Sequence, residues 1–181
     1  MNDRDIWTIG HGGTPWVDFV DQLRANGIQV VADVRALPGS KRSPQFDQDA
    51  MREALSEAGI DYEHLLGLTG RRRKQGVDEA INAGWQNASF RNYADYALSA
   101  QFCEALEQLE ELAATRRVAV LCGEPVPWRC HRLLLANALM AQGWTVHHIM
   151  GDRPAQQHRL GQWGAQPKVA ADHTVTYPAH S

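Results

Sequence analysis

Cys130, His131 and Arg132 stand together in the chain, directly before a strongly apolar segment, and Glu124 precedes them across a short loop. These residues supply a thiol, an imidazole, a guanidinium and a carboxylate. If the apolar segment is a helix, its N-terminus lowers the pKa of a nearby thiol and favours bound anions. An arginine there can make bidentate contacts with phosphate or carboxylate. We therefore expect a site that uses anion binding, thiol chemistry or both.

Three chemistries fit this segment. The first is an anion-binding catalytic loop in which His131 is an acid or base and Glu124 is a base or orients the imidazole. The second is a nucleophilic cysteine, either Cys130 or Cys122. The third is a metal held by both cysteines and a histidine. Paired C-x-x-C or H-x-x-x-H spacing is missing, so the third is the weakest, and we predict no metal and no cofactor.

A second candidate segment follows the first apolar run of the chain, where Gly10, His11 and Gly12 lead into Thr14 and Pro15. Glycines allow close approach of backbone to a ligand, and a helix that begins at Pro15 would offer free N–H groups to an anion. The alternative is that the glycines only form a tight turn. We assign Gly10 and Gly12 to substrate binding and His11 to acid/base catalysis.

Asp33 and Arg35 end the next apolar run, and Lys41 follows in a loop rich in Pro, Gly and Ser. A carboxylate at the end of a buried strand is costly unless it has a partner. Asp33 is therefore a candidate base or orienting group, or one half of a structural ion pair with Arg35. Arg35 and Lys41 are candidate ligands for an anion.

The pattern of elements explains why these segments would meet. Short runs rich in β-branched residues alternate with segments of helical periodicity. Such alternation predicts a single three-layer α/β/α domain with a mostly parallel sheet, whose strands all end at one edge, where ligands bind. We expect a long loop or lid over 67–90. We expect strands at 6–10, 28–34, 61–66, 118–122 and 145–149, and helices at 14–27, 47–59, 92–115 and 129–142.

Composition restricts the class of protein. The 181 residues suffice for one domain, and the net charge of −3 excludes a generally basic nucleic-acid binder. No apolar run is long enough to span a bilayer, so we predict no membrane partner. Three cysteines and no recognisable signal peptide favour a cytoplasmic protein. The cationic run 71–74 is either solvated surface or a phosphate-contacting patch, with Trp85 and Phe90 available to stack on bases.

Four segments in this order resemble the family called domain of unknown function 488 (DUF488). They are TIGHGGTPWVDFVDQL, VVADVRALPGSKRSPQF, FRNYADYA and VLCGEPVPWRCHRLLLANAL. The resemblance implies a compact α/β domain over 1–150 whose Gly-His, Asp-Val-Arg and Cys-His-Arg motifs match 10–11, 33–35 and 130–132. Residues 151–181 then form a C-terminal extension. Where the family usually has Ser and Asn after Gly-His, this chain has Gly12 and Gly13.

A more distant layout similarity links the strand, Cys122 loop and helix to rhodanese-like sulfurtransferases. Together these observations favour an enzyme acting on a phosphate-bearing ligand, a small molecule or a nucleic acid, held by Arg35 and Arg132. The alternatives are a cysteine-dependent sulfurtransferase or phosphatase-like enzyme and a non-catalytic nucleic-acid-binding module.

Overall fold

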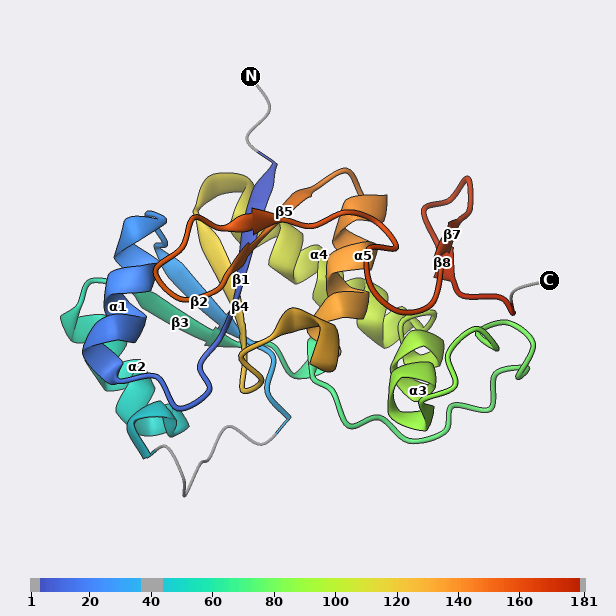
Figure 1. Cartoon of the computed structure of the whole chain (residues 1–181), viewed down its shortest axis with the longest axis horizontal. Helices are drawn as coiled ribbons and strands as arrows, with labels where there is room; N and C mark the ends of the chain where they lie inside the picture. Colours follow the sequence, from blue (N-terminus) through green and yellow to red (C-terminus); the bar gives the residue numbers. More distant parts are fainter. Residues whose placement is uncertain (1–3, 37–43, 180–181) are drawn as a thin grey trace.

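The fold is a parallel β-sheet covered by helices on both faces, as Figure 1 shows. It comes from a computed structural model that describes residues 4–36 and 44–179. The central sheet has the order β3-β2-β4-β1-β5-β6. All pairs are parallel except β5 with β6. The strands are β1 (Asp5–Gly10), β2 (Val30–Asp33), β3 (Asp61–His64), β4 (Val118–Cys122), β5 (Thr145–Ile149) and β6 (Gln156–Gln157).

Alternation along the strands divides the core into two layers. One layer lies beneath the helices α1 (Trp16–Ala25) and α2 (Gln48–Glu57), and it contains Ile9 and Leu121. The other lies beneath α3 (Ala88–Tyr96), α4 (Ala100–Thr115) and α5 (Arg132–Ala141), and it contains Val120 and Cys122. The predicted α/β/α architecture is confirmed. Adjacent residues at a strand end therefore face opposite layers, so both layers supply groups to the carboxyl edge.

Helical periodicity over 92–115 predicts one helix, but the structure has two. Ser99 interrupts the pattern because its hydroxyl accepts a hydrogen bond from the N–H of Phe102, which is an N-cap arrangement. The start of α1 also differs from the expectation, since Pro15 occupies the N-cap position expected for Thr14. The segment 67–90 is mostly irregular, as expected, with a short 3₁₀ turn at Leu66–Leu68 where it begins and the first residues of α3 where it ends.

The C-terminal segment packs on the domain and closes part of its core. It contains β6 and a hairpin of β7 (Lys168–Val169) and β8 (Val175–Thr176). Tyr177 is buried in the layer beneath α5, and His158 is completely buried. Trp163 lies 5.1 Å from Trp128, measured between ring centroids. Within residues 151–179, His158 and Tyr177 thus join the buried interior, while most of the other residues stay exposed or half-buried.

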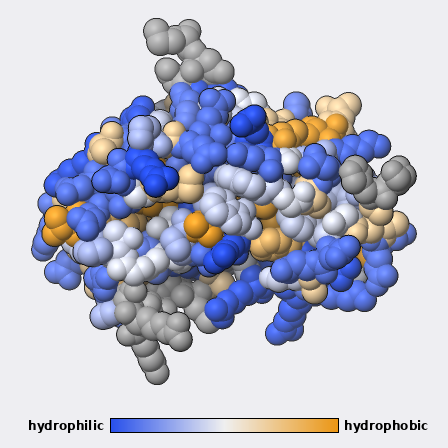
Figure 2. Space-filling view, viewed as in Figure 1, coloured by the Kyte–Doolittle hydropathy of each residue, from blue (hydrophilic) through white to orange (hydrophobic). Residues whose placement is uncertain are grey.

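Hydrophilic residues cover most of the face seen in Figure 2, and the apolar residues there form small separate patches. Within the described ranges, no helix combines the length and apolar character needed to cross a bilayer.

Candidate functional site

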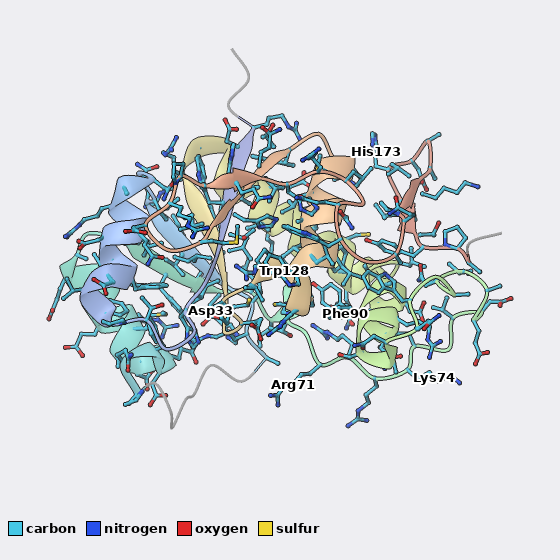
Figure 3. All side chains as sticks on the ribbon, viewed as in Figure 1. Asp33, Arg71, Lys74, Phe90, Trp128 and His173 are labelled. Atoms are coloured by element: carbon cyan, nitrogen blue, oxygen red, sulfur yellow. The ribbon has the colours of Figure 1, made fainter. Side chains whose placement is uncertain are left out.

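A cleft of about 440 Å³ opens at the carboxyl edge of the sheet. This volume is typical of a small-molecule site. The strand ends and loops of three segments line it through His11, Arg35, Cys122, Glu124, Cys130 and His131. Figure 3 places Asp33, Arg71 and Phe90 around this lower edge, with His173 at the far side of the molecule. Segments remote in sequence therefore do converge.

Two thiols form the floor of the cleft. The Sγ atoms of Cys122 and Cys130 are 2.9 Å apart, and the two residues are 2% and 8% exposed. Their surroundings shift the pKa values of the two thiols in opposite directions. Burial, together with the hydrogen bond to Cys130, raises the pKa of Cys122 well above its ordinary value. The same hydrogen bond, helped by His131 and Arg132, holds the pKa of Cys130 well below its ordinary value. The contact between the two sulfurs therefore favours ionisation of Cys130 over ionisation of Cys122.

The local backbone favours this ionisation. Cys130 precedes α5 in an extended conformation, and its Sγ accepts the N–H of Arg132 at 3.5 Å. An anion in this position occupies the positive end of the helix. The Nδ1 atom of His131 lies 3.6 Å from the same sulfur, and its Nε2 is buried without a hydrogen-bond partner among the described residues. The ring of Tyr93 holds the imidazole in place at 4.8 Å between centroids.

Arg132 supplies a positive charge behind the thiols. Its side chain is completely buried, with Nη2 donating to the Glu124 carbonyl at 2.8 Å and Nη1 to the Thr8 hydroxyl at 3.4 Å. No carboxylate of residues 4–36 or 44–179 forms an ion pair with it. A buried cation needs a compensating negative charge. Ionisation of Cys130, whose pKa is lowered in part by this guanidinium, would supply that charge.

A chain of buried hydrogen bonds continues from this guanidinium into the C-terminal segment. Thr8 Oγ1 lies 2.6 Å from His148 Nδ1, and His148 Nε2 lies 3.0 Å from His158 Nδ1. His158 Nε2 meets the Asn137 carbonyl oxygen at 2.8 Å. Because that oxygen only accepts, both imidazoles must carry their proton on Nε2, and Thr8 must donate to His148.

Both imidazoles in this chain are neutral. Burial, together with the charges of His158 and Arg132, lowers the pKa of His148 to about 3. Burial lowers the pKa of His158 to about 4. Two neutral rings add no positive charge to a region where Arg132 already carries one.

A second network lies on the α1/α2 side of the cleft. Arg35 donates from Nε and Nη2 to both carboxylate oxygens of Asp33, with distances of 2.8 to 3.1 Å. The Tyr62 hydroxyl donates to the same carboxylate, and burial with this bond raises the pKa of Tyr62. Arg35 Nη1 reaches the Phe46 carbonyl at 2.7 Å and His11 Nε2 at 3.3 Å. Asp33 therefore orients Arg35, which in turn fixes His11.

His11 is a neutral base at the cleft wall. Its Nδ1 lies 2.8 Å from the Gly12 carbonyl, so it carries the proton there, and Nε2 is left as the acceptor that faces Arg35. The ring stacks on Phe46 at 4.4 Å. Burial, aided by the charge of Arg35, lowers the pKa of His11.

The glycines of the first loop serve packing between two loops. His11 N–H and Gly12 N–H donate to the carbonyls of Cys122 and Gly123, at 3.0 and 2.9 Å. A Cβ on Gly10 would lie 1.8 Å from the Glu124 carbonyl oxygen. Gly10 is therefore required so that the loop after β4 can cross β1 closely. The amides of His11 and Gly12 are thus bonded to that loop, and the lining of the cleft includes neither Gly10 nor Gly12.

The cationic run 71–74 does not act as one patch. Arg72 stacks over the Tyr96 ring at 3.7 Å and donates to the carbonyls of Leu66 and Thr69. Lys74 forms an exposed ion pair with Glu79. Arg71 is the member that lines the cleft, and it does so from a left-handed backbone with φ of 59°.

The expected site residues divide into three groups. Those that line the cleft are His11, Arg35, Glu124, Cys130 and His131. Asp33 and Arg132 lie behind it, and both side chains are completely buried. Lys41 lies outside the described residues.

Sequence reasoning missed Arg129 as a cleft-lining group and His158 as part of the buried chain, whereas Phe90, considered there for stacking on bases, does line the cleft. The charge of Arg129, one residue before the Cys-His-Arg motif, was the only signal available. In the described part of the chain, no group of three His, Cys, Asp or Glu side chains is arranged to hold a metal ion.

Comparison with known families adds one assignment. Residues 15–139 match the family model described as domain of unknown function DUF488. The chain belongs to the DUF488 family. The matched region contains both cysteines of the cleft, together with Asp33, Arg35 and the Cys-His-Arg motif. No curated protein and no solved structure matches the chain, so the similarity to rhodanese-like domains is not borne out.

Proposed function

We propose that this DUF488 protein is a cysteine-dependent enzyme that uses the Cys130 thiolate as a nucleophile toward a small anionic substrate. The observation that carries the proposal is the pairing of a buried, carboxylate-free Arg132 with a thiol that the first turn of α5 and a second thiol favour as an anion. A thiolate is the reactive form of cysteine, and helix N-termini activate it. A cysteine that only packs in the core would need neither a buried arginine nor a helix N-terminus beside its sulfur.

The charge of the cleft supports an anionic substrate. Three arginines, Arg35, Arg71 and Arg129, stand against one carboxylate, Glu124, among the lining residues. Because Arg35 is neutralised by Asp33, the exposed Arg71 and Arg129 are the groups that would hold the anion. The phosphate or carboxylate of the substrate would sit at the mouth, with its electrophilic atom above Cys130.

Acid/base assistance would come from two imidazoles. His131 Nδ1 is close to the Cys130 sulfur, and His11 presents an unprotonated Nε2 at the opposite wall. Glu124 is a further candidate base at the cleft. The purely acid/base enzyme considered from sequence would use the same groups but would retain activity in a Cys130→Ser variant.

Alkylation kinetics test this proposal, in a Cys103→Ser background because Cys103 is exposed. The Cys130 alkylation rate should follow a titration whose midpoint lies below that of free cysteine. The ratio of the alkylation rate with iodoacetate, which carries a carboxylate, to the rate with neutral iodoacetamide should be several-fold higher for Cys130 than for free cysteine.

Matched variants locate the anion site. Arg71→Gln and Arg129→Gln should each reduce the iodoacetate preference, whereas Lys74→Gln should leave it unchanged because Lys74 is outside the cleft. A titration midpoint at or above that of free cysteine would refute the nucleophile. Equal preferences in all variants would refute the anion site.

A further inference from the structure

Cys122 has no part in the attack proposed for Cys130, yet it lines the same cleft. Its Sγ lies 2.9 Å from the nucleophile. A sulfur–sulfur bond is about 2.05 Å long, so an approach of about 1 Å would join the two. A second thiol so close to a reactive thiolate needs an explanation beyond core packing.

The backbone between the two cysteines permits that approach. Cys122 ends β4, and Cys130 is the last residue before the His131–Arg132 start of α5. The seven residues between them form a loop that is half-buried to exposed at most positions and carries the exposed Trp128. A shift of this loop would bring Cys130 toward Cys122 without disturbing a strand.

The two thiols are also unequal in the way that exchange chemistry requires. Cys130 is the more exposed of the two, and it is the one that accepts hydrogen bonds as an anion. Cys122 lies deeper, and its Sγ donates to the Glu124 carbonyl at 3.5 Å. In thiol–disulfide exchange a low-pKa thiolate attacks first, and a second thiol then resolves the mixed disulfide.

We propose, on the basis of the function proposed above, that Cys122 is a resolving thiol and that the pair reduces a small anionic disulfide. The Cys130 thiolate attacks one sulfur of the substrate, the substrate S–S bond breaks, and one thiolate leaves. Cys122 then attacks Cys130 Sγ, its proton passes to the departing second thiolate, and a Cys122–Cys130 disulfide forms. The substrate gains two electrons and the two cysteines lose them.

The mouth of the cleft gives the substrate class. Arg71 and Arg129 are exposed cations on opposite loops of the lining, one after β3 and one after β4. A disulfide that carries carboxylates would bind both, while a cationic disulfide would be repelled. We therefore expect the cleft to prefer an anionic disulfide substrate, for the same reason that it should prefer iodoacetate.

The test uses the full chain with Cys103→Ser, reduced and then exposed to oxidised glutathione as the probe. Samples are quenched with N-ethylmaleimide and examined by intact mass. The expected result is loss of both thiols with no added mass. Cys122→Ser and Cys122→Ala should instead accumulate one glutathione adduct on Cys130, and Cys130→Ser should not react. Circular dichroism verifies that each variant is folded.

The outcomes separate the two proposals. A stable adduct on Cys130 in the protein that retains Cys122 would overturn the resolving role while leaving the nucleophile in place. No reaction at Cys130 in any folded variant would overturn both. Oxidised glutathione should react about tenfold faster than cationic cystamine, each normalised to free cysteine. Equal normalised rates would overturn the substrate class.

Discussion

The two buried imidazoles make a quantitative prediction about acid sensitivity. His148 and His158 are completely buried, and their pKa values in the fold are about 3 and about 4. In the unfolded chain a histidine has a pKa of about 6.5. Between these values the unfolded chain binds protons that the folded chain does not, so acid favours unfolding. The stability is complete above pH 6.5 and is lost as the pH falls toward 4.

The size of the loss follows from linkage. Each pKa unit corresponds to about 1.4 kcal/mol, so lowering the pH from 7 to 5 costs about 1.5 to 2 kcal/mol for each imidazole. The pair therefore costs about 3 to 4 kcal/mol, a large share of the 5 to 15 kcal/mol that stabilises a typical domain. At pH 5 both folded pKa values are already well below the pH. The exact pKa values of the two folded imidazoles therefore change the expected free-energy loss little.

Urea unfolding at pH 7, 6 and 5, followed by tryptophan fluorescence, measures this loss. The chain has six other histidines, so the diagnostic quantity is the difference between variants. His158→Gln should lower the unfolding free energy at pH 7, yet lose about 1.5 to 2 kcal/mol less between pH 7 and 5 than the parent. His148→Gln should behave in the same way.

The matched control is His173→Asn. His173 is exposed, and asparagine tolerates its positive φ of 71°. Between pH 7 and 5, His158→Gln and His148→Gln should each lose about 1.5 to 2 kcal/mol less than this variant. If His158→Gln and His148→Gln are both as acid-sensitive as the parent, then the buried rings are not neutral and the hydrogen-bond directions assigned to the chain are wrong.

Two further predictions concern the loops and the ion pair beside the cleft. Gly10→Ala places a Cβ against the Glu124 carbonyl oxygen and should lower the melting temperature by several degrees or more, whereas Gly13→Ala, which has open space, should change it little. A Gly10→Ala protein as stable as the parent would contradict the close crossing of the loops. Asp33→Asn strands a buried guanidinium and should cost about 3 to 5 kcal/mol in urea unfolding. Asp61→Asn, which breaks the exposed ion pair with Arg116, should lower the free energy of unfolding by about 1 kcal/mol or less. Equal losses in Asp33→Asn and Asp61→Asn would mean that burial of the ion pair does not determine its contribution.

The sheet and the convergence of the cleft residues were predictable from sequence. Val30 to Asp33 and Val118 to Cys122 are apolar, β-branched runs with few alternatives to a buried strand. Parallel strands then bring their carboxyl ends together, whatever the intervening sequence. The sequence therefore predicts that His11, Arg35 and Cys130 lie at one edge of the sheet, and all three line the cleft there.

The roles of individual residues were less predictable because one sequence pattern fits two geometries. A glycine such as Gly10 indicates close backbone approach, but the pattern does not say whether a ligand or another loop approaches. Arg132 in the first turn of a helix can face the solvent or the sheet, and only packing decides. His158 joins the site through contacts with strand and helix residues far away in the chain, which have no local signature.

The C-terminal segment and β1 affect the choice of limits for an expressed fragment of this domain. The matched region begins at residue 15 and ends at 139, yet β1 pairs with both β4 and β5, and neither β1 nor β5 lies within that region. A fragment trimmed to those limits would lose β1, β5 and β6, the adjacent strands on one side of the sheet, and with them Thr8, His148 and His158 of the buried polar chain. Expression trials on relatives should therefore extend well past both ends of the aligned segment.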